Sequence, residues 1–358
     1  MKSIVGVLLW IIVIIIIIIV GFINYLNINE YTPEDKVIIF ENKDNVDTQN
    51  ILLNDTISLL TWNIGYAGLD KNMDFFYDGG KKVRTSEEQT ITNLENIGDF
   101  IKKQGVEYDF LLFQEVDYGS KRSYYHNQAE IFNNLFKDYY PYNYPVINYY
   151  VKYLPFPVSE PLGKINSGLM IFSKKQPELC ERYSYISNYS WPKRLWMPDR
   201  CFMVCYYNLK DGKKLIVINL HNTAFDDGGI RKKQLKQLRD FCVNQYNHGN
   251  YIIAGGDWNM CPPGTASDIF SKLPEQDFKL ISIDSELFPD TWQYAYDSET
   301  PTNRYLNMPY NNNSAVATLD FYLLSPNIEV LSVKTINLDF EYSDHNPVAV
   351  KVKLLYDI

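Results

Sequence analysis

The feature that most constrains this chain is a short apolar run that ends in glycines and then in two polar residues. The run Ile252–Gly256 is followed by Asp257, Trp258 and Asn259. In an extended chain, residues two apart point to the same side, so Asp257 and Asn259 face one small volume while Trp258 packs on the other side. The glycines allow another backbone or a ligand to approach closely. The pattern predicts a buried strand that carries polar groups at its end, although turn residues after a strand are the plainer interpretation.

Several other apolar runs carry a polar residue at the end or inside, and an Asp inside such a run is costly to bury without a partner. They are Ile57–Asn63 with Asn63, Asp109–Glu115 with Glu115, Leu215–His221 with His221, Thr318–Leu324 with Asp320, and Val348–Leu354, which Asp344 and His345 precede. Each residue has an ordinary structural explanation by itself. Together they form a set of carboxylates, amides and imidazoles. Hard oxygen ligands suit Mg²⁺ or Mn²⁺, and no Cys or His spacing of a zinc site is present.

Three amphipathic patterns predict helices between the strands. One begins at Ser86 and reaches Ile101, one covers Asn127–Asp138, and one opens at Gly228 and Gly229. A loop with Arg194 and Arg200 precedes a further strand, and either arginine could meet a phosphate group.

The N-terminus predicts a membrane anchor. Every residue of Ile4–Ile23 is apolar or Gly, and about 20 such residues match the hydrocarbon core of a bilayer. A helix that is apolar all round needs lipid. Bulky residues follow the run, so a retained anchor is favoured over a cleaved signal peptide. Lys2 before the run and acidic residues after it indicate that the body of the protein lies outside the cytoplasm.

Composition limits the function classes. A formal net charge of -9 and a pI near 5.1 argue against a protein that grips nucleic acid through bulk positive charge, although a local basic patch stays possible. The five Cys residues have no metal-ligand spacing, and they are expected to be core thiols. Cys201 and Cys205 on one strand would lie roughly 13 Å apart, too far for a disulfide.

The stretch Tyr139–Leu162 is rich in Tyr and Pro. It predicts a hairpin or long loop that contacts substrate or lipid headgroups, or else a Tyr-rich pair of strands packed on the body.

Taken in order, seven short pieces of the chain resemble the endonuclease/exonuclease/phosphatase superfamily: TWNIGY, LLFQEVD, NSGLMIFSK, INLHN, GGDWN, LDFYLLS and SDHNP. The resemblance runs from about residue 57 to the C-terminus. His221 resembles the deoxyribonuclease, sphingomyelinase and phosphatase branches, and the NSGL piece is similar to sphingomyelinases. It implies an α/β fold, a four-layered sandwich of two mixed β-sheets flanked by helices and here preceded by a single transmembrane helix. The expected organisation is an anchor over 1–25, a juxtamembrane spacer over 26–55 and a catalytic domain over 56–358.

The resemblance also implies roles for the polar residues. Glu115 would be the principal Mg²⁺ ligand, with Asn63 beside it on the metal or its water. Asp344 would bind or orient a metal or its water. Mn²⁺ could replace Mg²⁺.

Five further residues would be catalytic. Asp320 would hold His345, which orients or deprotonates the attacking water, and Asp257 is the rival general base. Asn259 and His221 would stabilise the charge that grows on the phosphoryl oxygens, and His221 could also protonate the leaving group.

These expectations favour a membrane-anchored, extracytoplasmic, Mg²⁺-dependent phosphodiesterase that acts on nucleic acid or on a phospholipid or sphingolipid headgroup. The alternative is a non-catalytic surface binding protein on the same fold. The complete set of polar residues argues against that alternative, because a decayed site would have lost some of them. The oligomeric state stays open.

Overall fold

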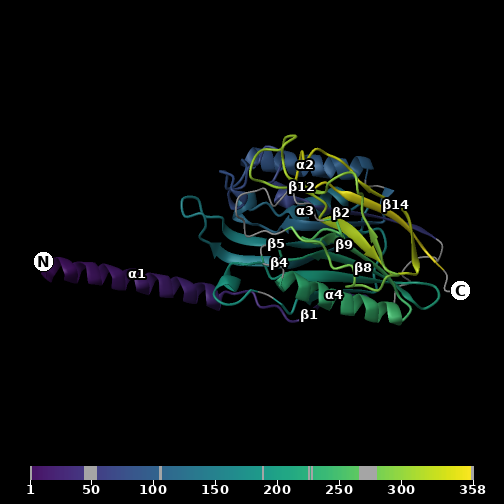
Figure 1. The fold of residues 1–358 in the computed structure, drawn as a ribbon, viewed down its shortest axis with the longest axis horizontal. Coiled ribbons are helices and arrows are strands. Elements are labelled where there is room, and N and C mark those ends of the chain that lie inside the picture. The colour runs from purple at the N-terminus through teal and green to yellow at the C-terminus, as the bar shows by residue number, and fades with distance from the viewer. Residues whose placement is uncertain are drawn as a thin grey trace.

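The computed structural model describes residues 2–43, 55–104, 107–187, 189–224, 226, 229–265 and 280–355. Two β-sheets pack face to face, and helices cover their outer faces (Figure 1). Helices α2 (Glu87–Gln104) and α3 (Gln128–Phe136) lie on one side and α4 (Gly229–Asn247) on the other. This architecture confirms the predicted four-layered α/β sandwich.

Both sheets are mixed. The six-stranded sheet has the order β14 (Ile328–Thr335), β15 (Val348–Leu354), β2 (Thr56–Asn63), β3 (Phe110–Asp117), β5 (Gly163–Ser173), β4 (Tyr142–Leu154). The seven-stranded sheet has the order β1 (Lys36–Glu41), β6 (Leu179–Ser184), β7 (Cys201–Asn208), β8 (Lys214–His221), β9 (Tyr251–Asp257), β13 (Asp320–Leu324), β10 (Gln293–Ala295). The short strands β11 (Asn303–Arg304) and β12 (Val316–Ala317) form a separate pair.

Three apolar layers hold the sandwich together. Side chains such as Leu112 and Ile253 fill the space between the sheets, and both are fully buried. Ile97 of α2 packs on the outer face of one sheet, and Leu238 of α4 packs on the outer face of the other. The central strands therefore bury both faces, which is why their sequences are almost continuously apolar.

A polar contact also joins the two sheets. The side-chain amide of Gln114 on β3 donates from Nε2 to Oδ1 of Asn219 on β8 at 2.7 Å. Asn219 in turn donates from Nδ2 to the carbonyl oxygens of Phe113 and Met170. Since all these groups are buried, the contact fixes how the sheets face each other.

The parallel strand pairs bring polar residues to one edge of the sandwich. β2 is parallel to β3, and β8 is parallel to β9, so all four strands end at the same edge. β13 is antiparallel to β9 and begins there, with Asp320 opposite Asp257. We call this edge the site edge.

The N-terminal helix α1 (Lys2–Ile28) extends away from the sandwich (Figure 1). Its segment Ile4–Ile28 is long and apolar enough to cross a membrane, and its most apolar part is not buried by the rest of the structure. A signal sequence has the same length and composition.

Part of the expected juxtamembrane spacer belongs to a sheet. β1 pairs antiparallel with β6, and Ile39 and Phe40 pack on the core between the sheets. The apolar patch Val37–Phe40 is thus an edge strand, because burial of its apolar side chains favours the sheet over solvent. Residues 44–54 of the spacer lie outside the described part of the chain.

The expectation of five free thiols was wrong for one pair. Cys180 on β6 and Cys205 on β7 form a disulfide, with Cα atoms 4.3 Å apart. The two residues are direct partners across neighbouring antiparallel strands, a relationship that spacing along one strand cannot reveal. Cys201, Cys242 and Cys261 are free and buried, as expected.

The aromatic stretch contains a long strand rather than only a loop. β4 pairs with β5, so the two strands form a hairpin with a turn over residues 155–162. The Tyr-rich strand pair was one of the two interpretations that the sequence left open.

Candidate active site

Three acid and imidazole side chains lie side by side because of strand register. His221 at the end of β8 is the partner of Asp257 on β9, and Asp257 is the partner of Asp320 on β13. From the opposite sheet, Asn63 donates from Nδ2 to Oδ2 of Asp257 at 3.0 Å. All four side chains are buried. The site is therefore built where the two sheets meet at the site edge.

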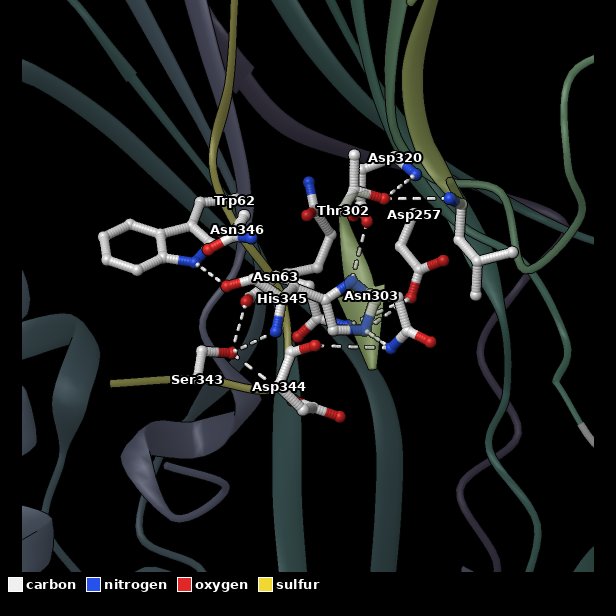
Figure 2. A network of polar contacts seen from close by, with 12 residues as sticks. Trp62, Asn63, Asp257, Thr302, Asn303, Asp320, Ser343, Asp344, His345 and Asn346 are labelled. Atoms are coloured by element: carbon white, nitrogen blue, oxygen red, sulfur yellow. Dashed lines mark hydrogen bonds and ion pairs between the residues drawn. The ribbon is translucent and has the colours of Figure 1, made fainter. Parts of the chain in front are cut away.

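Asp320 holds the imidazole of His345. Nδ1 of His345 lies 2.7 Å from Oδ2 of Asp320. Figure 2 shows both side chains within the network of polar contacts. Burial lowers the pKa of His345, but the carboxylates of Asp320, Asp344 and Asp257 outweigh that effect and raise the pKa to about 10. The neighbouring carboxylates thus favour the protonated form of His345.

Asp257 lies between the two imidazoles. Its Oδ2 is 3.3 Å from Nε2 of His221 and 3.8 Å from Nε2 of His345. Burial raises the pKa of Asp257 to about 7, although His345 lowers it in part and Asp320 raises it further. A carboxyl with such a pKa can exchange a proton near neutral pH.

The backbone after Asp257 turns sharply. Asn259 donates from its backbone N–H to Oδ1 of Asp257 at 2.9 Å and adopts a left-handed φ of 50°. Its side chain is buried and donates to the carbonyl oxygen of Asn222. Trp258 stacks on Phe321 and lies away from the acids.

Gly256 is required by the close packing of β9 on β8. A Cβ at this position would lie 2.1 Å from the carbonyl oxygen of Leu220, and its φ is +145°. No other residue type fits here without displacement of the neighbouring backbone.

Glu115 has an unusual backbone conformation. It lies in a β-bulge between β3 and β5 and has a φ of 53°, in the left-handed region. Such a conformation is strained for a residue other than glycine, and strain of this kind is concentrated at functional sites. The carboxylate oxygens of Glu115 lie 3.9 Å from Nη2 of Arg122 and 4.0 Å from Nε2 of His221.

Asp344 lies on the same side of the site as Glu115. Burial raises its pKa to about 6, His345 counteracts this in part, and the charge of Glu115 raises the pKa again. A buried carboxylate beside a second negative charge favours a bound cation.

Two groups of side chains could hold a metal ion. Glu115, Asp344 and Asn63 offer hard oxygen atoms, which suit Mg²⁺ and Mn²⁺. Asp257, Asp320 and His345 form a second group, with ligand atoms within 4.8 Å of one another. In that group the closest pair, His345 and Asp320, is already hydrogen-bonded. The first group fits a hard divalent ion better, because its carboxylates lack such a cationic partner at hydrogen-bond distance.

Arg200 contacts His221 from the loop before β7. Its Nη1 lies 2.9 Å from Nδ1 of His221, and its Nε is buried without a hydrogen-bond partner. Burial lowers the pKa of His221 well below the usual value, and the charges of Arg200, His345 and Arg122 lower it further. His221 is therefore a neutral imidazole.

A second arginine, Arg122, lies next to Glu115 in the site. Arg122 forms a two-bond ion pair with Asp117 at 2.9 and 3.2 Å, and its guanidinium lies 3.7 Å from the ring centre of Tyr66. The pair is buried, so it holds positive charge next to Glu115 without exposure to solvent.

The structure thus places near the site edge all eight residues to which the sequence assigned site roles, and three further residues, Arg200, Asn303 and Arg122, lie with them. Arg200 was recognised only as one of two arginines that could meet phosphate, and Arg194 instead pairs with Glu30 at 2.8 Å. The amide nitrogen of Asn303 on β11 lies 3.0 Å from Nε2 of His345. Asn303 stands in a polar stretch with no apolar run before it, so the sequence carried no signal for it. The sequence carried no signal for Arg122 either.

Comparisons with known proteins agree with this geometry. The sequence profile of the Endonuclease/Exonuclease/phosphatase family matches residues 60–345. No curated protein sequence matches the chain significantly.

Solved structures of the same fold are numerous. An endonuclease/exonuclease/phosphatase from Beutenbergia cavernae DSM 12333 is 15% identical, with 84% of this chain and 72% of that chain covered and a TM-score of 0.55. ANGEL2, described as a 2',3'-cyclic phosphatase and solved in complex with adenosine-2',3'-vanadate, is 14% identical, with 91% and 100% covered and a TM-score of 0.53. An endonuclease/exonuclease/phosphatase from Bacteroides vulgatus is 16% identical, with 84% and 99% covered and a TM-score of 0.51. At these identities the similarity establishes the fold.

Proposed function

Because the chain belongs to the endonuclease/exonuclease/phosphatase family, we propose that it is a membrane-anchored, Mg²⁺-dependent phosphodiesterase whose catalytic domain lies outside the cytoplasm. One observation carries the proposal. Asp257 lies between two imidazoles, one of which is held by Asp320 at 2.7 Å, and Glu115 lies 4.0 Å from the other. The amide of Asn63 also donates to Asp257. These acids, imidazoles and this amide can together activate a water molecule for attack on a phosphodiester.

Glu115, Asn63 and Asp344 would hold the metal ion. When bound, a divalent ion polarises the phosphoryl oxygen and supports the leaving oxygen. Asn63 also donates to Asp257 and accepts from the backbone N–H of Gly65 at 3.0 Å. Its amide would therefore fix the orientation of Asp257 relative to the metal ligands. Mn²⁺ would also fit this donor set.

Asp257 or His345 would deprotonate the attacking water. Two observations favour Asp257 as the base: its pKa of about 7, and the hydrogen bonds from Asn63 and the backbone of Asn259 that orient its carboxylate. His345, with a pKa near 10 in the free protein, would orient the water and balance the negative charge of the surrounding acids.

His221, Asn259 and Arg200 would stabilise the phosphoryl oxygens as negative charge grows on them. The low pKa of His221 favours hydrogen-bond donation to the phosphoryl group over protonation of the leaving group. The buried Nε–H group of Arg200 has no hydrogen-bond partner. A small reorientation of the guanidinium would let it reach an anionic oxygen.

The apolar helix α1 supports the membrane anchor, and Lys2 on its N-terminal side supports an extracytoplasmic domain. The substrate is then an exposed phosphodiester, in a nucleic acid or in a phospholipid or sphingolipid headgroup. No contact in the described chain favours the alternative of a non-catalytic binding protein.

A substrate panel with the full chain in lipid nanodiscs tests the proposal. DNA, RNA, sphingomyelin and bis(p-nitrophenyl) phosphate are incubated with Mg²⁺ or with EDTA, and product is measured. Hydrolysis of at least one substrate with Mg²⁺ and its loss in EDTA are expected. The enzymatic proposal fails if no substrate is cleaved with either Mg²⁺ or Mn²⁺. Salt dependence of KM then separates nucleic acid from a neutral headgroup, because only nucleic acid releases condensed counterions.

A further inference from the structure

The β4–β5 hairpin projects beyond the active site. β3 ends at Asp117, which is paired with Ser167 on β5. The hairpin continues past that point, since Leu154 on β4 is paired with Gly163 at the start of β5. The turn over 155–162 therefore extends outward from the site edge.

The connection from α1 enters the domain at the same edge. Lys36 at the start of β1 is paired with Tyr183 near the end of β6. β7 then begins beside the end of β8, where Phe202 is paired with Leu220 next to His221. The loop between β6 and β7 and the C-terminal end of α1 thus both lie at the edge that carries the catalytic side chains.

Specific contacts hold α1 against this edge. Leu26 is buried, and the ring of Phe22 lies 6.1 Å from that of Tyr153 on β4. Glu30, just after α1, forms an ion pair with Arg194 in the β6–β7 loop. Figure 1 shows α1 leaving the sandwich beside β4. The helix is thus docked on the domain by apolar, aromatic and ionic contacts, and the orientation of the site relative to α1 is defined.

The order of the contacts shows which way the hairpin extends. Tyr31, after α1, lies 6.0 Å from Tyr150, whereas Phe22, inside the apolar segment, contacts Tyr153. β4 therefore runs toward the apolar body of α1 as residue numbers rise. Phe156 follows three residues after Tyr153, in the turn to which this end of β4 leads.

The hairpin turn over 155–162 and the β6–β7 loop carry exposed apolar side chains. Phe156 is 48% exposed and Val158 is 80% exposed in the hairpin turn, and Trp191 in the β6–β7 loop is 55% exposed. Lys152 and Lys193, each close to one of these residues in sequence, are also exposed. Aromatic residues with flanking lysines suit the boundary between headgroups and acyl chains.

We propose that the site edge faces the bilayer that α1 crosses, with the turn 155–162 and Trp191 inserted at its surface, and that the phosphodiester hydrolysed is a lipid headgroup of that bilayer. This inference rests on the proposed membrane anchor and phosphodiesterase activity. A site held against the membrane meets lipid headgroups at high local concentration, whereas a nucleic acid would have to enter between the domain and the bilayer.

Insertion is tested without any need for activity. The full chain is reconstituted into vesicles of phosphatidylcholine, phosphatidylglycerol and sphingomyelin with a doxyl-labelled phosphatidylcholine. Phe156→Trp is compared with wild type and with Leu331→Trp, since Leu331 is an exposed apolar residue on β14. The added emission of Phe156→Trp should be shifted to the blue and quenched by doxyl lipid, while that of Leu331→Trp should be quenched by aqueous iodide. Iodide quenching of both variants alike would overturn the inference, whatever the activity of the protein.

The substrate class is tested with a charged hairpin. In Phe156→Asp/Val158→Asp, hydrolysis of sphingomyelin or phosphatidylcholine in the vesicles should fall at least about tenfold, because two apolar side chains no longer enter the lipid. Hydrolysis of soluble bis(p-nitrophenyl) phosphate should stay unchanged, and Leu331→Asp should affect neither rate. A wild-type protein that cleaves DNA or RNA but no lipid in the vesicles would overturn the substrate assignment and leave the phosphodiesterase proposal intact. Failure to cleave any substrate would instead count against the proposed function.

Discussion

Arg200 and His221 form a contact that decides which nitrogen of the imidazole carries a proton. Nη1 of Arg200 lies 2.9 Å from Nδ1 of His221. Because a guanidinium has only donors, Nδ1 must be the acceptor, and the proton of the neutral ring is on Nε2. Nε2 lies 3.3 Å from Oδ2 of Asp257. His221 therefore presents an N–H group to the centre of the site.

The first prediction concerns this contact. Arg200→Gln should lower kcat/KM for bis(p-nitrophenyl) phosphate by about 10- to 100-fold, because the orienting donor and a positive charge near the phosphoryl group are both lost. Arg200→Lys should recover part of the loss. Steady-state kinetics on the full chain measure the effect, with the unfolding temperature as a check on folding. Arg194→Gln removes an arginine of the same loop that pairs with Glu30, and it should leave kcat/KM within about twofold of wild type. Equal activity of Arg200→Gln and Arg194→Gln would contradict the role of Arg200.

The second prediction concerns the metal ligand. Glu115→Gln keeps the shape of the side chain but removes its charge, so the Mg²⁺ concentration for half-maximal activity should rise by about tenfold or more. Calorimetric titration with Mn²⁺ should show the same weakening without any substrate. Glu329→Gln changes an exposed acid on β14 and serves as the control. Unchanged Mn²⁺ affinity in Glu115→Gln would remove Glu115 from the metal site.

The third prediction concerns pH. Burial lowers the pKa of His345, but Asp320 and its neighbours raise it from 6.5 to about 10 in the folded protein. A basic group whose pKa is higher in the folded state stabilises the fold fully below its unfolded pKa, and that stabilisation is lost as the pH rises through the folded pKa. The contribution should therefore be complete below about pH 6.5 and absent above about pH 10.

Asp320→Asn tests this linkage, since it removes the strongest positive effect on the pKa of His345. In urea unfolding with EDTA, wild type should exceed the variant in free energy of unfolding, and the difference should shrink by about 1 kcal/mol or more between pH 6 and pH 10. His248→Asn, at an exposed position, should leave the pH profile unchanged. A difference that is constant with pH would show that the pKa of His345 does not depend on Asp320.

The fourth prediction concerns the polar contact between the sheets. Asn219→Leu should destabilise the protein by about 2–4 kcal/mol, because it leaves the buried Nε2 of Gln114 with one partner fewer and deprives two carbonyl oxygens of a donor. Urea unfolding measures the change, and Asn244→Leu on the exposed side of α4 is the matched control. The double variant Gln114→Leu/Asn219→Leu should recover part of the loss, since it removes both polar partners. No recovery would indicate that steric misfit rather than unpaired polar groups causes the loss.

Local patterns in the sequence were sufficient for much of the fold. Continuous apolar runs predicted the central strands, because both faces of these strands are buried, and the helical period of apolar residues predicted the helices α2, α3 and α4, because each buries one face. The same patterns placed Asn63 and His221 at strand ends, as the structure has them, whereas Glu115 was expected at a strand end and instead lies in a bulge two residues before β3 ends at Asp117. The apolar N-terminal run likewise predicted the long helix α1, whose length and composition suit a membrane span and also a signal sequence.

Contacts between distant segments could not be predicted in this way. β1 joins the sheet, Cys180 pairs with Cys205, and Asn303 reaches His345, and each contact depends on which strands become neighbours. Neighbours are decided by the packing of the whole chain, since no single segment contains both partners.

The sequence by itself determined which residues could do chemistry and at which end of each strand they stand. Only the tertiary structure decided their chemical states, because a pKa or a tautomer depends on burial and on charges brought from other strands. Burial and then Arg200 lower the pKa of His221, whereas Asp320 and its acidic neighbours raise the pKa of His345 against the effect of burial. Two histidines that look alike in the sequence thus have pKa values that are shifted in opposite directions in the folded protein.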